Sequence, residues 1–319
     1  MIRKAIKGLF LILLCVSGFA INSCHDTVKG SEPHRNVSSK FVNLNPLPEP
    51  APLSREFKSY WYSGEAEISS YELEQVRYGE IRKGSAVQVF VTEPFLADKQ
   101  VKANFSRNGN IPVLKLNSTK KFLTGIYPYS IMTSTFSPVN QSGHALKVSN
   151  SVQEWCGQVY TQLNNRDSFE IVAHSYFEGE ADRNLSLEKT VLEDELWNLI
   201  RLRPETLPTG TFKALPSMEF MRLSHKDIRS YEVTAERNVS NGLIDYTINY
   251  PELSRSLTIT YAQDFPHHIE GWTESIIRGS GSNSKTQTSR ARRIKSIKTA
   301  YWQQNSNRHL VLRDSLGLR

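Results

Sequence analysis

The residue best suited to nucleophilic chemistry is Cys156, which lies between Trp155 and Gly157. A thiol attacks only as the thiolate, which needs a neighbouring imidazole or cation, and His144 and His174 are the candidate bases. The alternative is that Cys156 packs in a strand as a small hydrophobic side chain, as free cysteines often do. The sequence favours this core position and leaves a Cys-dependent enzyme as a remote alternative.

The other residues that could do chemistry do not complete a known site. His267-His268 with Glu270 could begin a metal site, but neighbours on a strand point to opposite faces. Glu178, Glu180 and Asp182 could collect Ca²⁺, but they lack the glycine-marked loop of an EF-hand, so a solvated loop is expected. The Gly-x-Ser-x-Gly, Walker and Gly-x-Gly-x-x-Gly patterns do not occur. We therefore expect no metal, no cofactor and no enzymatic activity.

A basic strip lies near the carboxyl end of the chain. The 319 residues carry a formal charge of +7, yet residues 275–313 contain nine bases and no acid. The candidate ligand-binding residues of this strip are Arg290, Arg292, Arg293 and Lys295. They could bind phosphates of anionic lipid or lipopolysaccharide, and the alternative is a solvated charged strand. On a regular strand, Arg290 and Arg292 would face one side, and Arg293 and Lys295 the other.

The amino terminus has the pattern of an export signal. Residues 1–7 are basic, and residues 8–21 form an apolar run of 14 residues, which is too short to span a bilayer. The run ends in Ile21-Asn22-Ser23-Cys24, which resembles the lipobox of bacterial lipoproteins. That resemblance implies acylation of Cys24 and a membrane partner; the alternative is an ordinary secretory signal with a chance cysteine. His25 after the cysteine disfavours retention in the inner membrane, so the outer membrane is expected, with either face open.

The rest of the chain divides into a tether and a β-rich domain. Residues 24–54 contain five prolines and few aromatic residues, which is typical of an extended tether. Residues 55–319 alternate apolar and polar side chains between turn sequences, which predicts antiparallel strands. One of the predicted strands runs from Trp155 to Leu163. With Cys24 acylated, Cys156 is left alone, so no internal disulfide is expected.

One amphipathic helix is predicted at 187–203, because Leu192, Leu196, Leu199 and Ile200 recur at helical spacing. Ser186 is the candidate N-cap. The predicted fold is mainly β: a large curved antiparallel sheet, or sheets, or a half-barrel. Two sub-sheets at 55–180 and 204–300, joined by this helix, are a further alternative. The tail from 300 to 318 is expected to pack through Trp302, Leu310 and Leu312.

Two resemblances bear on this fold. The helix with Leu207-Pro208-Thr209-Gly210 and Asp264-Phe265-Pro266-His267-His268 resembles the periplasmic DUF3108 proteins over residues 190–275. That resemblance implies a curved antiparallel sheet related to lipoprotein carriers of the LolA type. Runs such as Thr124-Gly125-Ile126-Tyr127-Pro128-Tyr129-Ser130 and Gln153-Glu154-Trp155-Cys156-Gly157 resemble an uncharacterised family of Bacteroidota lipoproteins, which implies no particular activity.

Members of that family sometimes carry the label "septum formation inhibitor Maf". True Maf nucleotide pyrophosphatases have a Ser-x-Ser-Pro-Arg-Arg-like phosphate-binding run in an α/β fold. This chain contains no Ser-Pro-Arg, and its pattern is β. We therefore reject the label and expect no such activity.

The expected function is non-enzymatic. A lipid-anchored envelope protein with 13 Tyr, 14 Phe and five Trp could bind a lipid-like or amphipathic envelope component on an apolar face. The alternative is a scaffold or assembly lipoprotein of the outer membrane that binds envelope proteins and no small ligand. An exported protein meets lipid phosphates before nucleic acid, so no nucleic-acid partner is expected.

Overall fold

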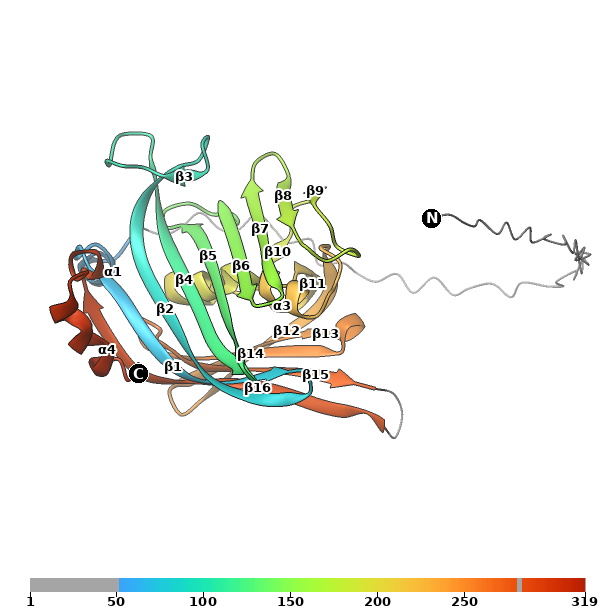
Figure 1. Ribbon diagram of the computed structural model, residues 1–319. Helices are drawn as coiled ribbons and strands as arrows, with labels where there is room; N and C mark the ends of the chain where they lie inside the picture. Colours follow the sequence, from blue (N-terminus) through green and yellow to red (C-terminus); the bar gives the residue numbers. More distant parts are fainter. Residues whose placement is uncertain (1–51, 280–282, 319) are drawn as a thin grey trace, which may run out of the picture. The chain divides into compact units, whose positions relative to one another are not determined.

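The computed structural model describes residues 52–279 and 283–318. The predicted signal segment, Cys24 and nearly all of the tether lie outside these residues. Strands dominate the fold (Figure 1). They are β1 (Ala66–Arg77), β2 (Glu80–Leu96), β3 (Val101–Lys102), β4 (Ile111–Thr124), β5 (Tyr127–Pro138), β6 (Lys147–Glu154), β7 (Gly157–Asn165), β8 (Phe169–His174), β9 (Arg183–Leu187), β10 (Val191–Leu192), β11 (Gly210–Leu215), β12 (Tyr231–Ser240), β13 (Leu243–Tyr250), β14 (Arg255–Ala262), β15 (Ile269–Arg278) and β16 (Lys285–Thr299).

All sixteen strands belong to one open sheet, which confirms the predicted large antiparallel sheet. The order is β10-β11-β12-β13-β14-β15-β16-β1-β2-β4-β5-β6-β7-β8-β9, with β3 paired to β2. Neighbours are antiparallel except β10 and β11. The alternative of two sub-sheets is wrong, because β16 pairs with β1 over nine residue pairs and joins the two halves.

The curvature of the sheet follows from its connections and its glycines. The edge strands β9 and β10 are separated by only three residues, 188–190, so the two edges of the sheet must approach each other. A Cβ on Gly84 would lie 2.2 Å from the carbonyl oxygen of Lys121, and one on Gly271 would lie 2.3 Å from that of Ala291. Glycine at these two positions therefore permits close approach of neighbouring strands.

The predicted helix exists but is shorter than expected. Helix α2 spans Glu193–Leu202, and Ser186 lies in β9, so the predicted cap at Ser186 is wrong. The helix starts where the Glu195 carboxylate accepts the N–H of Leu192 at 3.1 Å. Leu187 instead ends β9, and residues 188–190 connect it to β10. Val191 and Leu192 form β10, because they pair with β11.

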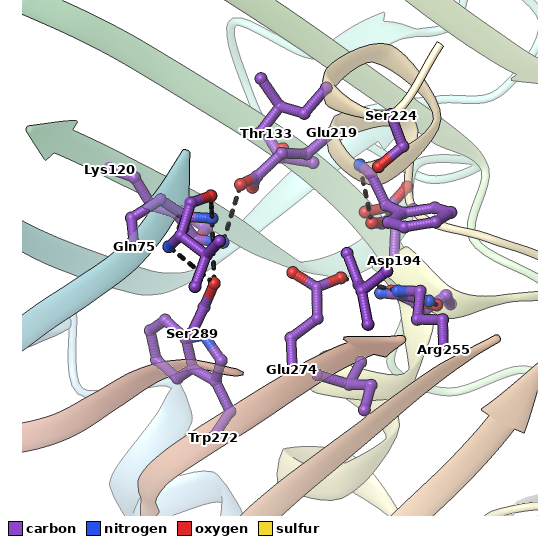
Figure 2. A pocket seen from close by; sticks show the side chains of 18 of the residues that line it. Gln75, Lys120, Thr133, Asp194, Glu219, Ser224, Arg255, Trp272, Glu274 and Ser289 are labelled. Atoms are coloured by element: carbon purple, nitrogen blue, oxygen red, sulfur yellow. Dashed lines mark hydrogen bonds and ion pairs between the residues drawn. The ribbon is translucent and has the colours of Figure 1, made fainter. Parts of the chain in front are cut away.

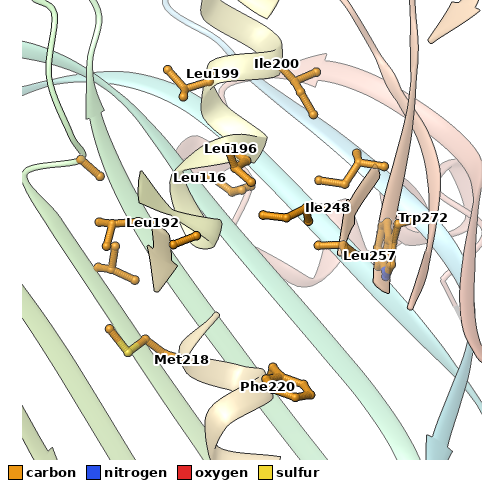
Figure 3. Packing of buried hydrophobic residues seen from close by; sticks show 14 of the residues in the cluster. Leu116, Leu192, Leu196, Leu199, Ile200, Met218, Phe220, Ile248, Leu257 and Trp272 are labelled. Atoms are coloured by element: carbon orange, nitrogen blue, oxygen red, sulfur yellow. The ribbon is translucent and has the colours of Figure 1, made fainter. Parts of the chain in front are cut away.

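The core lies between α2 and the concave face of the sheet. The predicted apolar residues of the helix, Leu192, Leu196, Leu199 and Ile200, are all at most 6% exposed, which confirms that part of the prediction (Figure 3). They pack with side chains from strands far apart in the sequence, such as Leu116 of β4 and Ile248 of β13. Helix α2 therefore ties the two halves of the curved sheet together.

Three smaller helices complete the fold: α1 (Arg55–Trp61), α3 (Met218–Leu223) and α4 (Val311–Ser315). Short 3-10 turns lie at Pro204–Thr206, Pro251–Leu253, Tyr301–Gln303 and Asn307–Leu310. Within the residues described, no helix is long and apolar enough to cross a membrane.

The tail packs through other residues than predicted. Trp302 and Leu310 are 46% and 61% exposed, whereas Leu316 and Leu318 are buried against Ile68. The prediction is therefore wrong for Trp302 and Leu310, whereas Leu312 is half-buried. The Ser70 hydroxyl donates to the Leu316 carbonyl and holds the tail to β1.

Candidate functional site

The inner, concave face of the sheet contains a cleft beside the amino end of α2 (Figure 2). Strands β1, β4, β5, β14, β15 and β16 form its walls, and α3 lies across it. Its labelled lining side chains are Gln75, Lys120, Thr133, Asp194, Glu219, Ser224, Arg255, Trp272, Glu274 and Ser289. The cavity volume is about 80 Å³.

Five of the charged side chains that line this cleft are paired with one another: Arg255, Glu193, Glu274, Lys120 and Glu219. Arg255 donates to both oxygens of Glu193 and, through Nε, to Glu274 at 2.6 Å. Lys120 donates to Glu219 at 2.8 Å. Burial would lower the pKa of Lys120, but the charges of Glu219 and Glu274 outweigh it and raise that pKa. These ion pairs hold strands and helices together, so the groups are already engaged without a ligand.

Asp194 is an acid of the cleft whose pKa lies well above its usual value. Burial raises its pKa to about 7; the hydrogen bond from the Met218 N–H opposes the shift, and the charges of Glu193 and Glu219 add to it. That N–H lies 3.0 Å from the Asp194 carboxylate, which thereby holds the start of α3. The carboxyl is partly protonated near neutral pH, and this costs folding stability.

A second buried ion pair lies at the other end of α2. The Arg201 guanidinium donates to both oxygens of Glu67 on β1, each at 2.6 Å, and both side chains are 1% exposed. Burial would raise the pKa of Glu67, but the charge of Arg201 and the hydrogen bonds from His268 and Arg201 outweigh it, so the pKa lies below its usual range. This pair stabilises the join between α2 and β1.

The outer, convex face holds a larger and more apolar groove, which we call the outer groove. The outward-facing residues of β1, β2, β4 and β16 form its floor, and the carboxyl-terminal tail forms its wall. Its apolar lining residues are Ile68, Val87, Val89, Ile297, Tyr301, Leu312, Leu316 and Leu318. The cavity volume is about 360 Å³, which falls within the range of small-molecule sites.

Basic side chains border the outer groove. Lys121 and Arg313, both exposed, line it together with His309. Lys295 pairs across the ladder with Ser70, and Ser70 pairs on its other side with Val87 of the groove floor. Lys295 therefore lies on the same face, next to the groove, because directly opposed residues in a sheet share a face.

The predicted basic strip forms most of β16, but its faces differ from the prediction. Ser70 pairs with Lys295 and the next residue, Tyr71, pairs with Arg293, so Ile294 of β16 is an extra residue without a partner on β1. This bulge places Lys295 on the outer face beside Ile297, while Arg293 binds Glu270 at 2.7 Å. The prediction that Arg293 and Lys295 share a face is therefore wrong.

The other two strip residues lie beside acids. Arg292 forms an ion pair with Glu72 at 2.9 Å, and both side chains are exposed. Arg290 stands opposite Glu74 in the register. Acids of β1 thus offset much of the charge that the sequence concentrates here, and of the four candidate residues Lys295 lies next to the outer groove.

The core position predicted for Cys156 is wrong. The predicted strand that begins at Trp155 is divided by a turn at Trp155-Cys156, and Cys156 is exposed at its tip. Its backbone N–H donates to Glu154 at 2.7 Å. The interaction of the thiol with Glu154 raises the thiol pKa, which disfavours the reactive thiolate.

The histidines and acidic loop residues form pairs rather than a metal cluster. His174 lies 3.4 Å from Asp182, and His225 lies 2.6 Å from Glu180. Among the described residues, no group of three or more His, Cys, Asp or Glu side chains is placed to hold a metal ion. His144, one of the two bases considered for Cys156, is paired with Glu195 of α2 at 2.8 Å.

The outer groove was not predicted, although the sequence contains a signal for it. On β2, Val87, Val89 and Val91 alternate with Ala86, Gln88 and Phe90, and the second set faces the core. A strand with apolar residues on both faces must cover its second face with another element or a ligand. The wall of the groove, however, comes from a tail more than 200 residues away in the chain, which strand periodicity does not reveal.

Comparisons with known proteins do not assign the chain to a family. No family model matches the chain, and no curated protein matches it significantly. Among solved structures, a porin-like protein from Bacteroides uniformis has a TM-score of 0.21 and 10% sequence identity to this chain, over 71% of this chain and 97% of that one. A likeness of that size carries no argument about function.

Proposed function

We propose that this protein is a lipid-anchored, non-enzymatic component of the cell envelope that binds an anionic amphipathic molecule in the outer groove. The observation that carries the proposal is the groove itself: an apolar floor and wall with Lys121, Arg313 and Lys295 around it. The inner cleft is smaller, and five of its charged side chains are already paired with one another.

The groove suits an acyl chain with a charged end. Each buried methylene contributes about 0.8 kcal/mol, so a short chain on Val87, Val89 and Ile68 yields useful affinity. A phosphate at the rim would accept charge-assisted hydrogen bonds from lysine or arginine. The groove thus favours a ligand that combines an apolar chain with an anionic head.

Two ligands that share a chain separate the apolar and ionic contributions. We expect dodecyl phosphate to bind more tightly than dodecanol in calorimetric titrations. Replacing Lys121 and Lys295 together by Ala should weaken dodecyl phosphate binding about tenfold or more, because charge-assisted hydrogen bonds are lost. The same double variant should leave dodecanol binding unchanged. Binding of the phosphate should also weaken between about 50 and 500 mM salt, where the screening length falls about threefold.

Two further variants serve as controls for this titration. Lys213→Ala removes an exposed lysine of β11, far from the groove in sheet order, and should change neither affinity. Val87→Trp should fill the groove and abolish binding of both ligands while the urea midpoint stays close to that of the parent. If neither ligand binds the parent protein, the groove only seats the tail, and the scaffold alternative stands.

The anchor is a separate part of the proposal, supported by Ile21-Asn22-Ser23-Cys24. Replacing Cys24 by Ala should make the protein extractable from the membrane fraction by a carbonate wash, because acyl chains supply the attachment that resists this wash. Fractionation with a carbonate wash measures this. A Cys24→Ala protein that stays with the membrane after the wash would contradict acylation at this residue.

A further inference from the structure

Three hairpins of the sheet have large apolar residues in their two-residue turns. The turns are Tyr78-Gly79 between β1 and β2, Gly125-Ile126 between β4 and β5, and Trp155-Cys156 between β6 and β7. Two-residue hairpin turns normally contain Asn, Asp or Gly, because both positions favour polar residues that tolerate positive φ. The β12–β13 turn of the same sheet, Asn241-Gly242, follows that rule. Gly79 and Gly125 follow the same rule, but turn geometry does not call for the large apolar residues Tyr78, Ile126 and Trp155 at the other positions.

The apolar side chains at these turns are among the most exposed in the described chain. Ile126 is 83% exposed, Trp155 68% and Tyr78 59%. Large apolar side chains that the turns do not require and that stay mostly exposed point to a functional surface.

The three turns are neighbours. Their strands are consecutive in the sheet, in the order β1-β2-β4-β5-β6-β7. Tyr127 connects two of the hairpins, because its ring centroid lies 6.3 Å from that of Trp155. Tyr78 connects to the same pair, because its hydroxyl lies 2.9 Å from that of Tyr129 on β5. The turns form one continuous edge of the sheet, which we call the apolar edge.

Lysines stand behind the apolar edge on the outer face. Ile81 on β2 and Leu123 on β4 are 56% and 59% exposed. Lys83 and Lys121 lie two residues further from the turns and face the same side, since side chains on a strand alternate. Exposed aliphatic residues with lysines one step behind them match the depth profile of a bilayer interface, in which long basic side chains reach back to the phosphates.

Among the acids near the edge, Glu74 stands between Lys83 and Arg290 in the register, and the others are engaged or lie at the far end. Glu80 pairs with Arg82 at 2.8 Å, and Glu154 accepts the N–H of Cys156. The acidic β8–β9 loop follows beyond β7, so the basic part of the edge lies with β2 and β4. Charge complementarity therefore favours an anionic surface that meets the β1–β2 and β4–β5 turns first.

We propose that the apolar edge is a membrane-docking surface that inserts its turn residues into the headgroup region of an anionic bilayer. Ile126, Trp155 and Tyr78 enter the interface, and Lys83 and Lys121 bind lipid phosphates. The bilayer is the occupant because tyrosine, tryptophan and aliphatic residues with flanking lysines are the side chains that such interfaces select. Docking through this edge is distinct from binding in the outer groove and from acylation at Cys24.

The test uses the chain from residue 24 with Cys24→Ser, so that no acyl chain is present and Cys156 is the only thiol. We expect co-sedimentation with vesicles of phosphatidylcholine containing 30% phosphatidylglycerol, and weaker binding to pure phosphatidylcholine. An environment-sensitive dye on Cys156 should shift its emission to the blue when these vesicles are added, because the turn enters a less polar region.

The matched variants are Ile126→Asp and Phe105→Asp. Both replace an exposed side chain, 83% and 70% exposed respectively, so neither should disturb the fold. Ile126→Asp should weaken vesicle binding at least tenfold, and Phe105→Asp, which lies in the loop after β3, should leave it unchanged. Absence of vesicle binding, equal losses in the two variants, or binding without a shift of the dye would each overturn the proposal. Failure of ligand binding in the outer groove would leave these results unaffected.

Discussion

Replacing Arg201 by Met should destabilise the fold by about 3–5 kcal/mol, because it leaves the charge of Glu67 buried without its partner. Met keeps much of the side-chain volume against Trp61 and Phe90, so the loss reports mainly on the charge. Urea unfolding at pH 7, followed by circular dichroism, measures the change.

Two comparison variants identify the cause of that loss. Arg292→Met removes one partner of the exposed pair with Glu72 and should cost at most about 1 kcal/mol. The double variant Arg201→Met/Glu67→Gln should recover most of the stability lost in Arg201→Met, since no unpaired charge remains. If Arg201→Met costs no more than Arg292→Met, the pair does not hold α2 to β1.

Replacing Asp194 by Asn should have a large effect of the opposite sign, stabilising the fold by about 2–4 kcal/mol at pH 8. Burial raises the pKa of Asp194 from 3.8 to about 7 in the folded chain. Between these values the unfolded chain has lost the proton that the native chain keeps, so stability falls as pH rises from about 4 to 7. The neutral amide avoids this loss and still accepts the N–H of Met218.

The pH dependence is the decisive readout for Asp194. The gain in Asp194→Asn should shrink as the pH is lowered and vanish near pH 4, where both states of the parent hold the proton. Urea midpoints at pH 4, 6 and 8 follow it. Glu232→Gln, at an exposed position of β12, should stay within about 0.5 kcal/mol of the parent throughout. A gain that does not depend on pH would show that Asp194 titrates normally.

The sequence predicts the apolar side of α2 well and its polar side poorly. The spacing of Leu192, Leu196, Leu199 and Ile200 indicates a helix that faces the core, and all four are buried. An amphipathic helix ordinarily turns its charged side to solvent, yet Glu193, Asp194, Glu195 and Arg201 are buried as well. Their partners, Arg255 and Glu67 among them, come from distant strands, and long-range ion pairs leave no periodic signal.

On β16, strand alternation predicts the orientation of some basic side chains but not of others. Strand alternation correctly places Arg290 and Arg292 on one face, but a single inserted residue, Ile294, reverses the alternation for Lys295. A bulge of this kind depends on the register with the partner strand and cannot be located from one strand alone. Strand alternation also predicts Cys156 inside a strand, whereas a two-residue turn, Trp155-Cys156, exposes it.

Native mass spectrometry of the protein purified from its own membrane fraction tests the central claim most directly. We expect the parent protein to carry a bound species whose mass fits an amphipathic molecule with an acidic headgroup. We expect this species to be absent from Val87→Trp protein purified in the same way. Lys213→Ala protein should retain the species. A parent protein that carries no such molecule, or a Val87→Trp protein that carries it equally, would contradict binding in the outer groove.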